Sequence, residues 1–108
     1  GGVPAAQNTM HETPSSAHAR AVLHLCETLT AAGHTVISAN TDERAEPQIF
    51  AQSDAGELAF YFVRADAPEP DAAELDRFRA LAARHRVAAY YAPVTLAPAP
   101  RCLDLRPL

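Results

Sequence analysis

The segment from residue 46 to residue 66 constrains the fold more than any other part of the chain. It reads EPQIFAQSDAGELAFYFVRAD, which predicts two strands joined by a tight turn. Gly56 in this turn supplies the positive φ that a short hairpin needs. The second strand, residues 58–65, is almost continuously apolar, a pattern typical of a central strand that is covered on both faces.

Side chains alternate along this second strand, so they divide between the two faces of a sheet. Leu58, Phe60, Phe62 and Arg64 are expected on one face, and positions 59, 61 and 63 on the other. The strand therefore presents a row of large aromatic side chains that ends in a single cation.

The remaining elements follow from periodicity and from capping residues. Apolar positions three and four apart predict a helix over residues 17–32, which Gly33 ends. A strand is expected over residues 35–39. Asp71 begins a second helix that runs to about His85, with Glu74 completing a variant of the capping box. A last strand is expected over residues 86–96, either at a sheet edge or bent at Pro93, which has no backbone donor.

Length and composition predict one small α/β domain. The chain has 108 residues, of which 48% are hydrophobic. We expect residues 1–14 to be a flexible leading segment or a cloning remnant, residues 15–108 to form the domain, and the proline-rich residues 97–108 to form an irregular tail. The element order α-β-β-β-α-β predicts a four-stranded mixed sheet flanked by helices. No stretch has the length and apolarity of a membrane span, so we expect a cytoplasmic protein.

At this point the chain resembles the PD-(D/E)xK superfamily of restriction-endonuclease-like nucleases, and most closely the small bacterial proteins related to Holliday-junction resolvases. Their pattern is a helix followed by G-Y-x-I-L-x-x-N, then E-I-D-x-I-A, a turn and F-V-E-V-K. Residues 33–40 read GHTVISAN, residues 46–51 read EPQIFA, and residues 60–64 read FYFVR. The resemblance covers residues 17 to 96 and implies the restriction-endonuclease-like fold.

The resemblance also implies where a metal site would lie, and those positions carry the wrong residues. In such nucleases an Asp and a Glu hold a divalent cation and a Lys assists the attacking water. The resemblance places the nuclease Asp, Glu and Lys at Gln48, Phe62 and Arg64 of this sequence. It places the Glu of the first nuclease helix near Val22. A neutral amide, a phenyl ring and a guanidinium that stays protonated cannot do that chemistry. The sequence therefore predicts a degenerate catalytic site with no metal and no cofactor.

These losses favour a noncatalytic domain that acts as a protein-interaction or structural module. We expect Phe60, Phe62 and Arg64 to form an apolar surface with one cation, suited to a protein partner or to a second copy of the chain. One alternative is a divergent nuclease in which Glu46, Glu57 or Glu74 has replaced the lost carboxylates. A histidine and a glutamate three apart on the first helix, His24 and Glu27, are too few ligands for zinc.

A third possibility is nucleic-acid binding without cleavage. Four arginines surround the second helix and are its candidate contacts: Arg77, Arg79, Arg84 and Arg86. The chain has nine arginines and no lysine, and its formal net charge is −4. That acidic balance disfavours a phosphate-binding surface, because nucleic-acid-binding domains usually carry a basic stripe.

Overall fold

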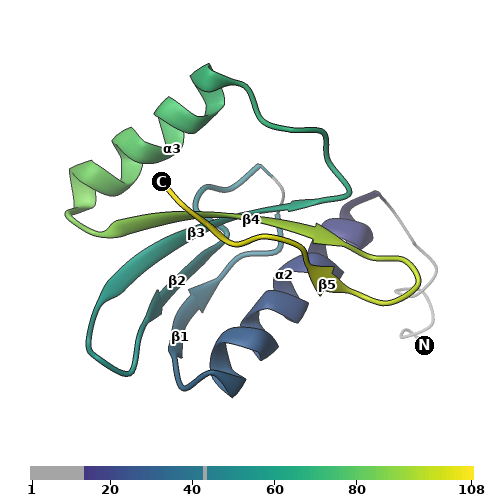
Figure 1. The fold of residues 1–108 in the computed structure, drawn as a ribbon, viewed down its shortest axis with the longest axis horizontal. Coiled ribbons are helices and arrows are strands. Elements are labelled where there is room, and N and C mark those ends of the chain that lie inside the picture. Colours follow the sequence, from purple (N-terminus) through teal and green to yellow (C-terminus); the bar gives the residue numbers. More distant parts are fainter. Residues whose placement is uncertain (1–13, 43) are drawn as a thin grey trace, which may run out of the picture.

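A mixed six-stranded sheet lies between two helices in the part of the chain that the structure describes (Figure 1). The structure is a computed structural model that describes residues 14–42 and 44–108. Helix α2 (Pro14–Ala31) covers one face of the sheet and helix α3 (Ala72–His85) covers the other. The architecture is thus three-layered α/β. The expectation for residues 1–13 lies outside the described residues.

The sheet contains an antiparallel meander joined to a parallel strand. Strand β2 pairs with β1 and β3 on its two sides, antiparallel in both cases, whereas β3 and β4 are parallel and α3 connects them. Two short strands, β5 and β6, pair antiparallel with the far side of β4. The strands are β1 (Thr35–Ala39), β2 (Ile49–Gln52), β3 (Leu58–Ala65), β4 (Ala88–Thr95), β5 (Arg101–Cys102) and β6 (Arg106–Pro107).

The chain after β4 corrects two expectations. The sheet has six strands instead of four, and residues 97–108 contain β5 and β6 instead of being wholly irregular. Strand β4 is therefore an interior strand, although it contains Pro93. The Pro93 carbonyl accepts from the Leu103 N–H at 2.9 Å, on the side of the tail. Pro93 falls between the part of β4 that pairs with β5 and the part that pairs with β6, so its missing donor removes no bond from either short ladder.

Local signals explain the ends of the helices. Helix α2 ends one residue before the expected position, and Gly33 follows with φ +94°. The His34 N–H bonds the Leu29 carbonyl at 2.9 Å, which is the hydrogen bond that closes a glycine-terminated helix. At the start of α3, Asp71 Oδ1 accepts from the Glu74 N–H at 2.8 Å, so the predicted cap is confirmed.

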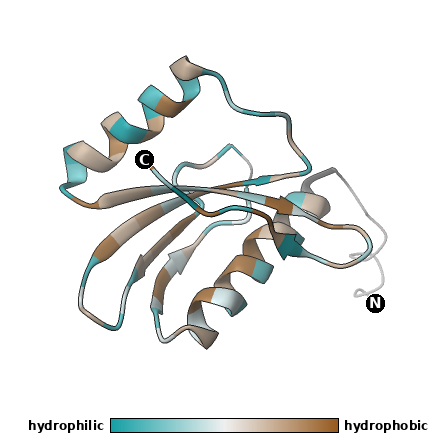
Figure 2. Cartoon of the chain, in the orientation of Figure 1, coloured by the Kyte–Doolittle hydropathy of each residue, from teal (hydrophilic) through white to brown (hydrophobic). Residues whose placement is uncertain are grey.

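The predicted alternation along β3 is also confirmed, and it produces two hydrophobic cores. Tyr61 and Val63 face α2 and pack with Val22 and Leu25. The aromatic residues at positions 60 and 62 face α3 and pack with Phe78. Figure 2 shows the corresponding pattern on α3, where hydrophilic and apolar stretches alternate along the helix. Among the described residues, neither helix has the length and apolarity needed to cross a membrane.

Candidate functional site: an arginine centre above an aromatic stack

The aromatic side chains that the sequence marks as a binding surface lie beneath helix α3. Phe62 is 0% exposed and Phe60 is 6% exposed. The Phe62 ring stacks on the Phe78 ring of α3 with centroids 4.2 Å apart and planes 12° apart. This corrects the expectation of an exposed aromatic patch. The alternation of β3 places both rings on one face, but α3 packs on that face and removes it from solvent.

Arg64 follows this stack on β3 and joins two carboxylates. Its Nη2 donates to Glu46 Oε2 at 3.3 Å and to Glu74 Oε2 at 3.2 Å, while Nη1 donates to the Val63 carbonyl at 2.9 Å. The guanidinium lies 5.1 Å from the centroid of the Phe78 ring. Only 19% of the Arg64 side chain is exposed. Such a partly desolvated cation is held by both its carboxylate partners and the ring face.

A second arginine completes the cluster from the first turns of α3. Arg77 binds Glu46 through two parallel hydrogen bonds, Nη2 to Oε2 at 2.8 Å and Nε to Oε1 at 3.1 Å. Its guanidinium also lies over Phe78, 5.3 Å from the ring centroid. The hydrogen bonds from Arg77 hold the pKa of Glu46 below its ordinary value of 4.5. We call Glu46, Arg64, Glu74, Arg77 and Phe78 the Arg64 centre.

Gln48 occupies a structural position at the start of β2. Its side chain is buried, with 1% of the residue exposed. The Oε1 atom accepts from the Val63 N–H at 2.8 Å, and Nε2 donates to the Ala45 carbonyl. Both ends of the amide are therefore used by the backbone, which gives this side chain a structural role in the fold.

The position that the resemblance assigns to the glutamate of the first helix lies apart from the position that it assigns to the second carboxylate. Val22 lies in the core beneath α2, whereas Phe62 lies in the core beneath α3. The sheet separates these two positions. The structure instead brings Glu46 and Glu74 together at Arg64, and leaves Glu57 beside the turn at the opposite end of the β2–β3 hairpin.

A family model matches most of the chain. Residues 16–104 match the family model described as Domain of unknown function (DUF8840). The chain belongs to the DUF8840 family. No curated protein and no solved structure gives a significant match to it.

The carboxylates of this DUF8840 domain that lie nearest to a metal arrangement are already neutralised. Glu46 and Glu74 carry two negative charges, and Arg64 and Arg77 carry two positive charges within hydrogen-bonding distance of them. Hard divalent cations bind carboxylates whose charge is available to the ion. Within residues 14–42 and 44–108, no group of three or more His, Cys, Asp or Glu side chains has a metal-binding arrangement.

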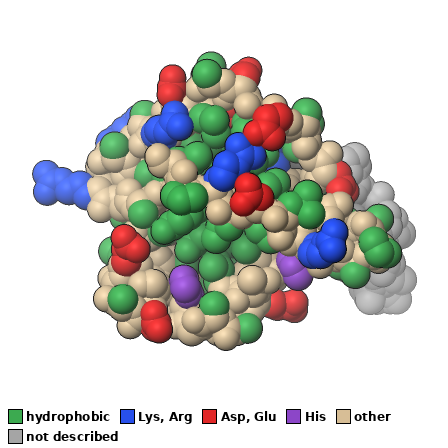
Figure 3. Space-filling view, in the orientation of Figure 1, with side chains coloured by type: hydrophobic (Ala, Val, Ile, Leu, Met, Phe, Trp, Pro, Cys, Tyr) green, Lys and Arg blue, Asp and Glu red, His purple; other side chains and the backbone are tan. Residues whose placement is uncertain are grey.

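The arginines around α3 do not form a uniform basic surface. Arg77 is paired with Glu46, and Arg79 is paired with Asp76 at 3.0 Å. Arg84 and Arg86 are exposed at the end of the helix. On the face drawn in Figure 3, basic side chains are interspersed with acidic ones, and hydrophobic side chains gather in the middle of the view.

Sequence reasoning missed the composition of the Arg64 centre. It identified Arg64 and Arg77 as separate binding candidates and Glu46 and Glu74 as possible replacement ligands, but not their mutual pairing. Glu46 and Arg77 are 31 positions apart, and no local pattern relates them. One signal was present: Glu74 occupies the third helical position after the Asp71 cap, which directs its carboxylate toward the helix N-terminus, close to the end of β3.

Proposed function

We propose that this chain is a noncatalytic domain of restriction-endonuclease-like architecture that acts as a protein-interaction or structural module. One observation carries the proposal. Where the resemblance places the catalytic lysine, Arg64 bridges Glu46 and Glu74 above a buried aromatic stack. The position is thus filled by groups that stabilise one another and that hold no free carboxylate.

The arrangement of the elements supports the architectural part of the proposal. The order from α2 to β4 is α-β-β-β-α-β, which is the order that the resemblance implies. The β1–β2–β3 meander and the parallel pairing of β3 with β4 place one helix on each face. Strands β5 and β6 are additions at the side of β4 and do not interrupt this core.

The chemistry of the Arg64 centre supports the noncatalytic part. A divalent cation at this position would have to displace Arg64 from both carboxylates, or lie beside the guanidinium group of Arg64. Phe62 offers no ligand atom, and the Gln48 amide is engaged by Val63 and Ala45. Each of the three positions has thus become part of the packing of the domain.

A cleavage assay tests the proposal directly. The purified chain is incubated with linear and with branched DNA, in the presence of Mg²⁺ and, separately, of Mn²⁺. We expect both substrates to stay intact in both metals. Metal-dependent cleavage that survives repurification and disappears in a variant of the Arg64 centre would overturn the proposal.

A divergent nuclease is the second candidate, and the convergence of Glu46 and Glu74 on Arg64 favours it over other enzymes. The variants Glu46→Gln and Glu74→Gln separate it from the noncatalytic reading, because each removes one carboxylate charge and keeps the shape of the side chain. Glu57→Gln is the matched control, since Glu57 lies at the other end of the hairpin. Cleavage lost in the first two variants and kept in the control would establish the enzyme.

Nucleic-acid binding without cleavage is tested in the same samples. Contacts to phosphate release counterions, so such binding weakens steeply as salt is raised. The pairing of Arg77 and Arg79 with acidic residues leaves little free positive charge on α3. We expect fluorescence anisotropy of labelled DNA to show no saturable binding at physiological salt, and Arg84→Glu to change nothing.

A further inference from the structure

The outer edge of strand β1 is open. In the residues that the structure describes, β1 is the terminal strand of the sheet and no strand pairs with its outer side. Its sequence, TVISA, contains neither a charged residue nor a proline, the usual means by which proteins block edge pairing. Four of its five residues are exposed, and Ile37 is 49% exposed. The pairing of β1 with β2 has an irregularity between Val36 and Ser38, a feature that can oppose edge pairing.

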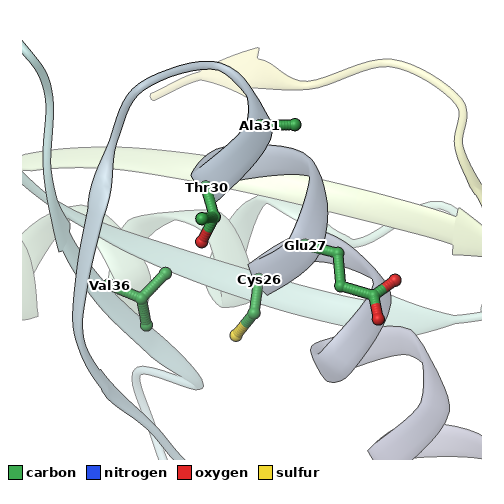
Figure 4. Close-up of a pocket in the computed structure, with 5 residues that line it drawn as sticks. All are labelled: Cys26, Glu27, Thr30, Ala31 and Val36. Carbon is green, nitrogen blue, oxygen red and sulfur yellow. The ribbon is translucent and has the colours of Figure 1, made fainter.

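An apolar cavity lies beside this edge, between β1 and α2. Its volume is about 410 Å³, and its lining residues are Cys26, Glu27, Thr30, Ala31 and Val36. Figure 4 shows Cys26 and Thr30 on the side of α2 that faces Val36, with the carboxylate of Glu27 directed away from them. Burial raises the pKa of the Cys26 thiol, so the floor of the cavity stays uncharged at neutral pH. The cavity therefore suits apolar side chains of a partner.

The outward side of α2 next to this cavity carries one cation, one leucine and one anion. Arg20, Leu23 and Glu27 are three and four positions apart and so lie on one face of the helix. Leu23 is 53% exposed. The side chains of Arg20 and Glu27 form no hydrogen bond or ion pair with another described residue, in contrast to the charges of the Arg64 centre. We call this face, the cavity and the outer edge of β1 together the β1 flank.

The positions of Arg20 and Glu27 along α2 favour a second copy of the chain as the partner. When a helix is placed antiparallel to a copy of itself about a two-fold axis near Leu23, Arg20 of each copy faces Glu27 of the other. Both unpaired charges are then satisfied, and the exposed leucines meet at the axis. The same axis, perpendicular to the sheet, makes β1 antiparallel to its own copy and brings both α2 helices to one face of a continuous sheet.

We propose that the β1 flank binds a second copy of this chain, with β1 paired to β1 and α2 packed against α2. The inference deepens the proposed function, because it gives the partner of the interaction module, and in that sense it rests on it. The surface is nevertheless separate from the Arg64 centre. The charge self-complementarity of α2 is the observation that points to a second copy in place of an unrelated peptide.

Sedimentation velocity on the full chain tests the interface through charge reversal. We expect the wild-type chain to dimerise as its concentration rises. Arg20→Glu alone sets two acidic residues against each other at each contact, and Glu27→Arg alone sets two basic ones, so each variant should dimerise roughly tenfold more weakly. An equimolar mixture of the two variants should recover the dimer, because the acidic face of one chain then meets the basic face of the other. Arg84→Glu, an equal charge change on α3, should leave dimerisation unchanged.

A second variant tests the strand edge independently of the helix. Ile37→Lys puts a charge in the middle of β1, which opposes edge pairing, and should also weaken dimerisation. Circular dichroism and thermal unfolding of every variant verify that the fold is kept. A monomeric wild-type chain at all concentrations overturns the inference, as does a dimer that neither single variant weakens or that the mixture fails to restore. If the chain is a monomer that does not cleave DNA, the dimer inference fails and the proposed function stands. If the chain is a dimer that cleaves DNA, the proposed function fails and the dimer inference stands.

Discussion

The Arg64 centre and the β1 flank both combine acidic, basic and apolar side chains, but only in the Arg64 centre are the charges paired and the apolar group buried within the chain. In the Arg64 centre, Glu46 and Glu74 are each bonded to arginine, and the Phe78 ring beneath them is 0% exposed. In the β1 flank, Arg20 and Glu27 have no such partner among the described residues, and Leu23 is half exposed. Groups satisfied within the chain stabilise its fold, while groups left open are available to another molecule.

A cluster of charged side chains can thus stabilise the fold or bind another molecule. The arginines and glutamates of the Arg64 centre resemble a binding site in composition, yet removing Arg64 would leave Glu74 partly buried and without its ion pair. The charges of the β1 flank are solvated in the monomer and can be changed without that penalty. Mutations in the two regions should therefore affect different measurements, stability for the first and association for the second.

The largest expected effect is on the aromatic stack. Phe78→Ala removes the ring that packs on Phe62 and lies under both arginines, and should cost about 3–5 kcal/mol of unfolding free energy. Leu23→Ala, on the β1 flank, should change the stability of the monomer by less than about 0.5 kcal/mol. Chemical denaturation at low protein concentration measures both. Phe78→Leu keeps an apolar side chain and should fall between them; equal losses at positions 78 and 23 would remove the distinction between the two regions.

A smaller effect is expected at the buried amide. Gln48→Ala leaves the Val63 N–H and the Ala45 carbonyl without their partner and should cost about 1–3 kcal/mol. Thr30→Ala, in the lining of the β1 flank, removes a side chain that has no hydrogen bond to another described residue and should be nearly neutral. Thermal unfolding of the two variants side by side checks this. A Gln48→Ala protein as stable as the wild type would show that the amide has no structural role.

The smallest expected effect is on the loss of folding stability at acidic pH. The bonds from Arg77 lower the folded-state pKa of Glu46 below its ordinary value of 4.5, so the unfolded chain takes up the proton at a higher pH than the folded chain. The stability that these bonds to Glu46 contribute is therefore complete above about pH 4.5, and it is lost as the pH falls through the folded-state pKa of Glu46. Because Glu46 is partly exposed, we expect it to be below about 1 kcal/mol.

Two variants isolate this contribution. Glu46→Gln should lose stability at neutral pH and show a shallower decline in acid than the wild type. Glu27→Gln, in the β1 flank, should follow the wild-type profile, because Glu27 has no ion pair among the described residues. Urea unfolding at a series of pH values from neutral to acid provides the comparison. A parallel acid decline in all three proteins would exclude Glu46 as a source of it.

The sequence predicted the fold better than it predicted the site, for identifiable reasons. The start of β3 and the start of α3 follow from turn and capping residues that lie next to them, namely Gly56 and Asp71. Strands β5 and β6 are two residues long, so they have no periodicity, and they exist because β4 offers them an edge. Alternation placed Phe60 and Phe62 on one face, but whether that face is solvent or helix depends on where α3 packs.

The central proposal is that the ion pairs with Arg64 neutralise Glu46 and Glu74, so that these two carboxylates hold no divalent ion. Titration of the ¹⁵N-labelled chain with Mn²⁺ tests it most directly, because a bound paramagnetic ion broadens the NMR signals of the backbone amides around its site. We predict no selective broadening at positions 46, 64 and 74 beyond that of exposed carboxylates such as Asp42. Saturable broadening centred on those three positions, and abolished by Glu74→Gln, would contradict the account.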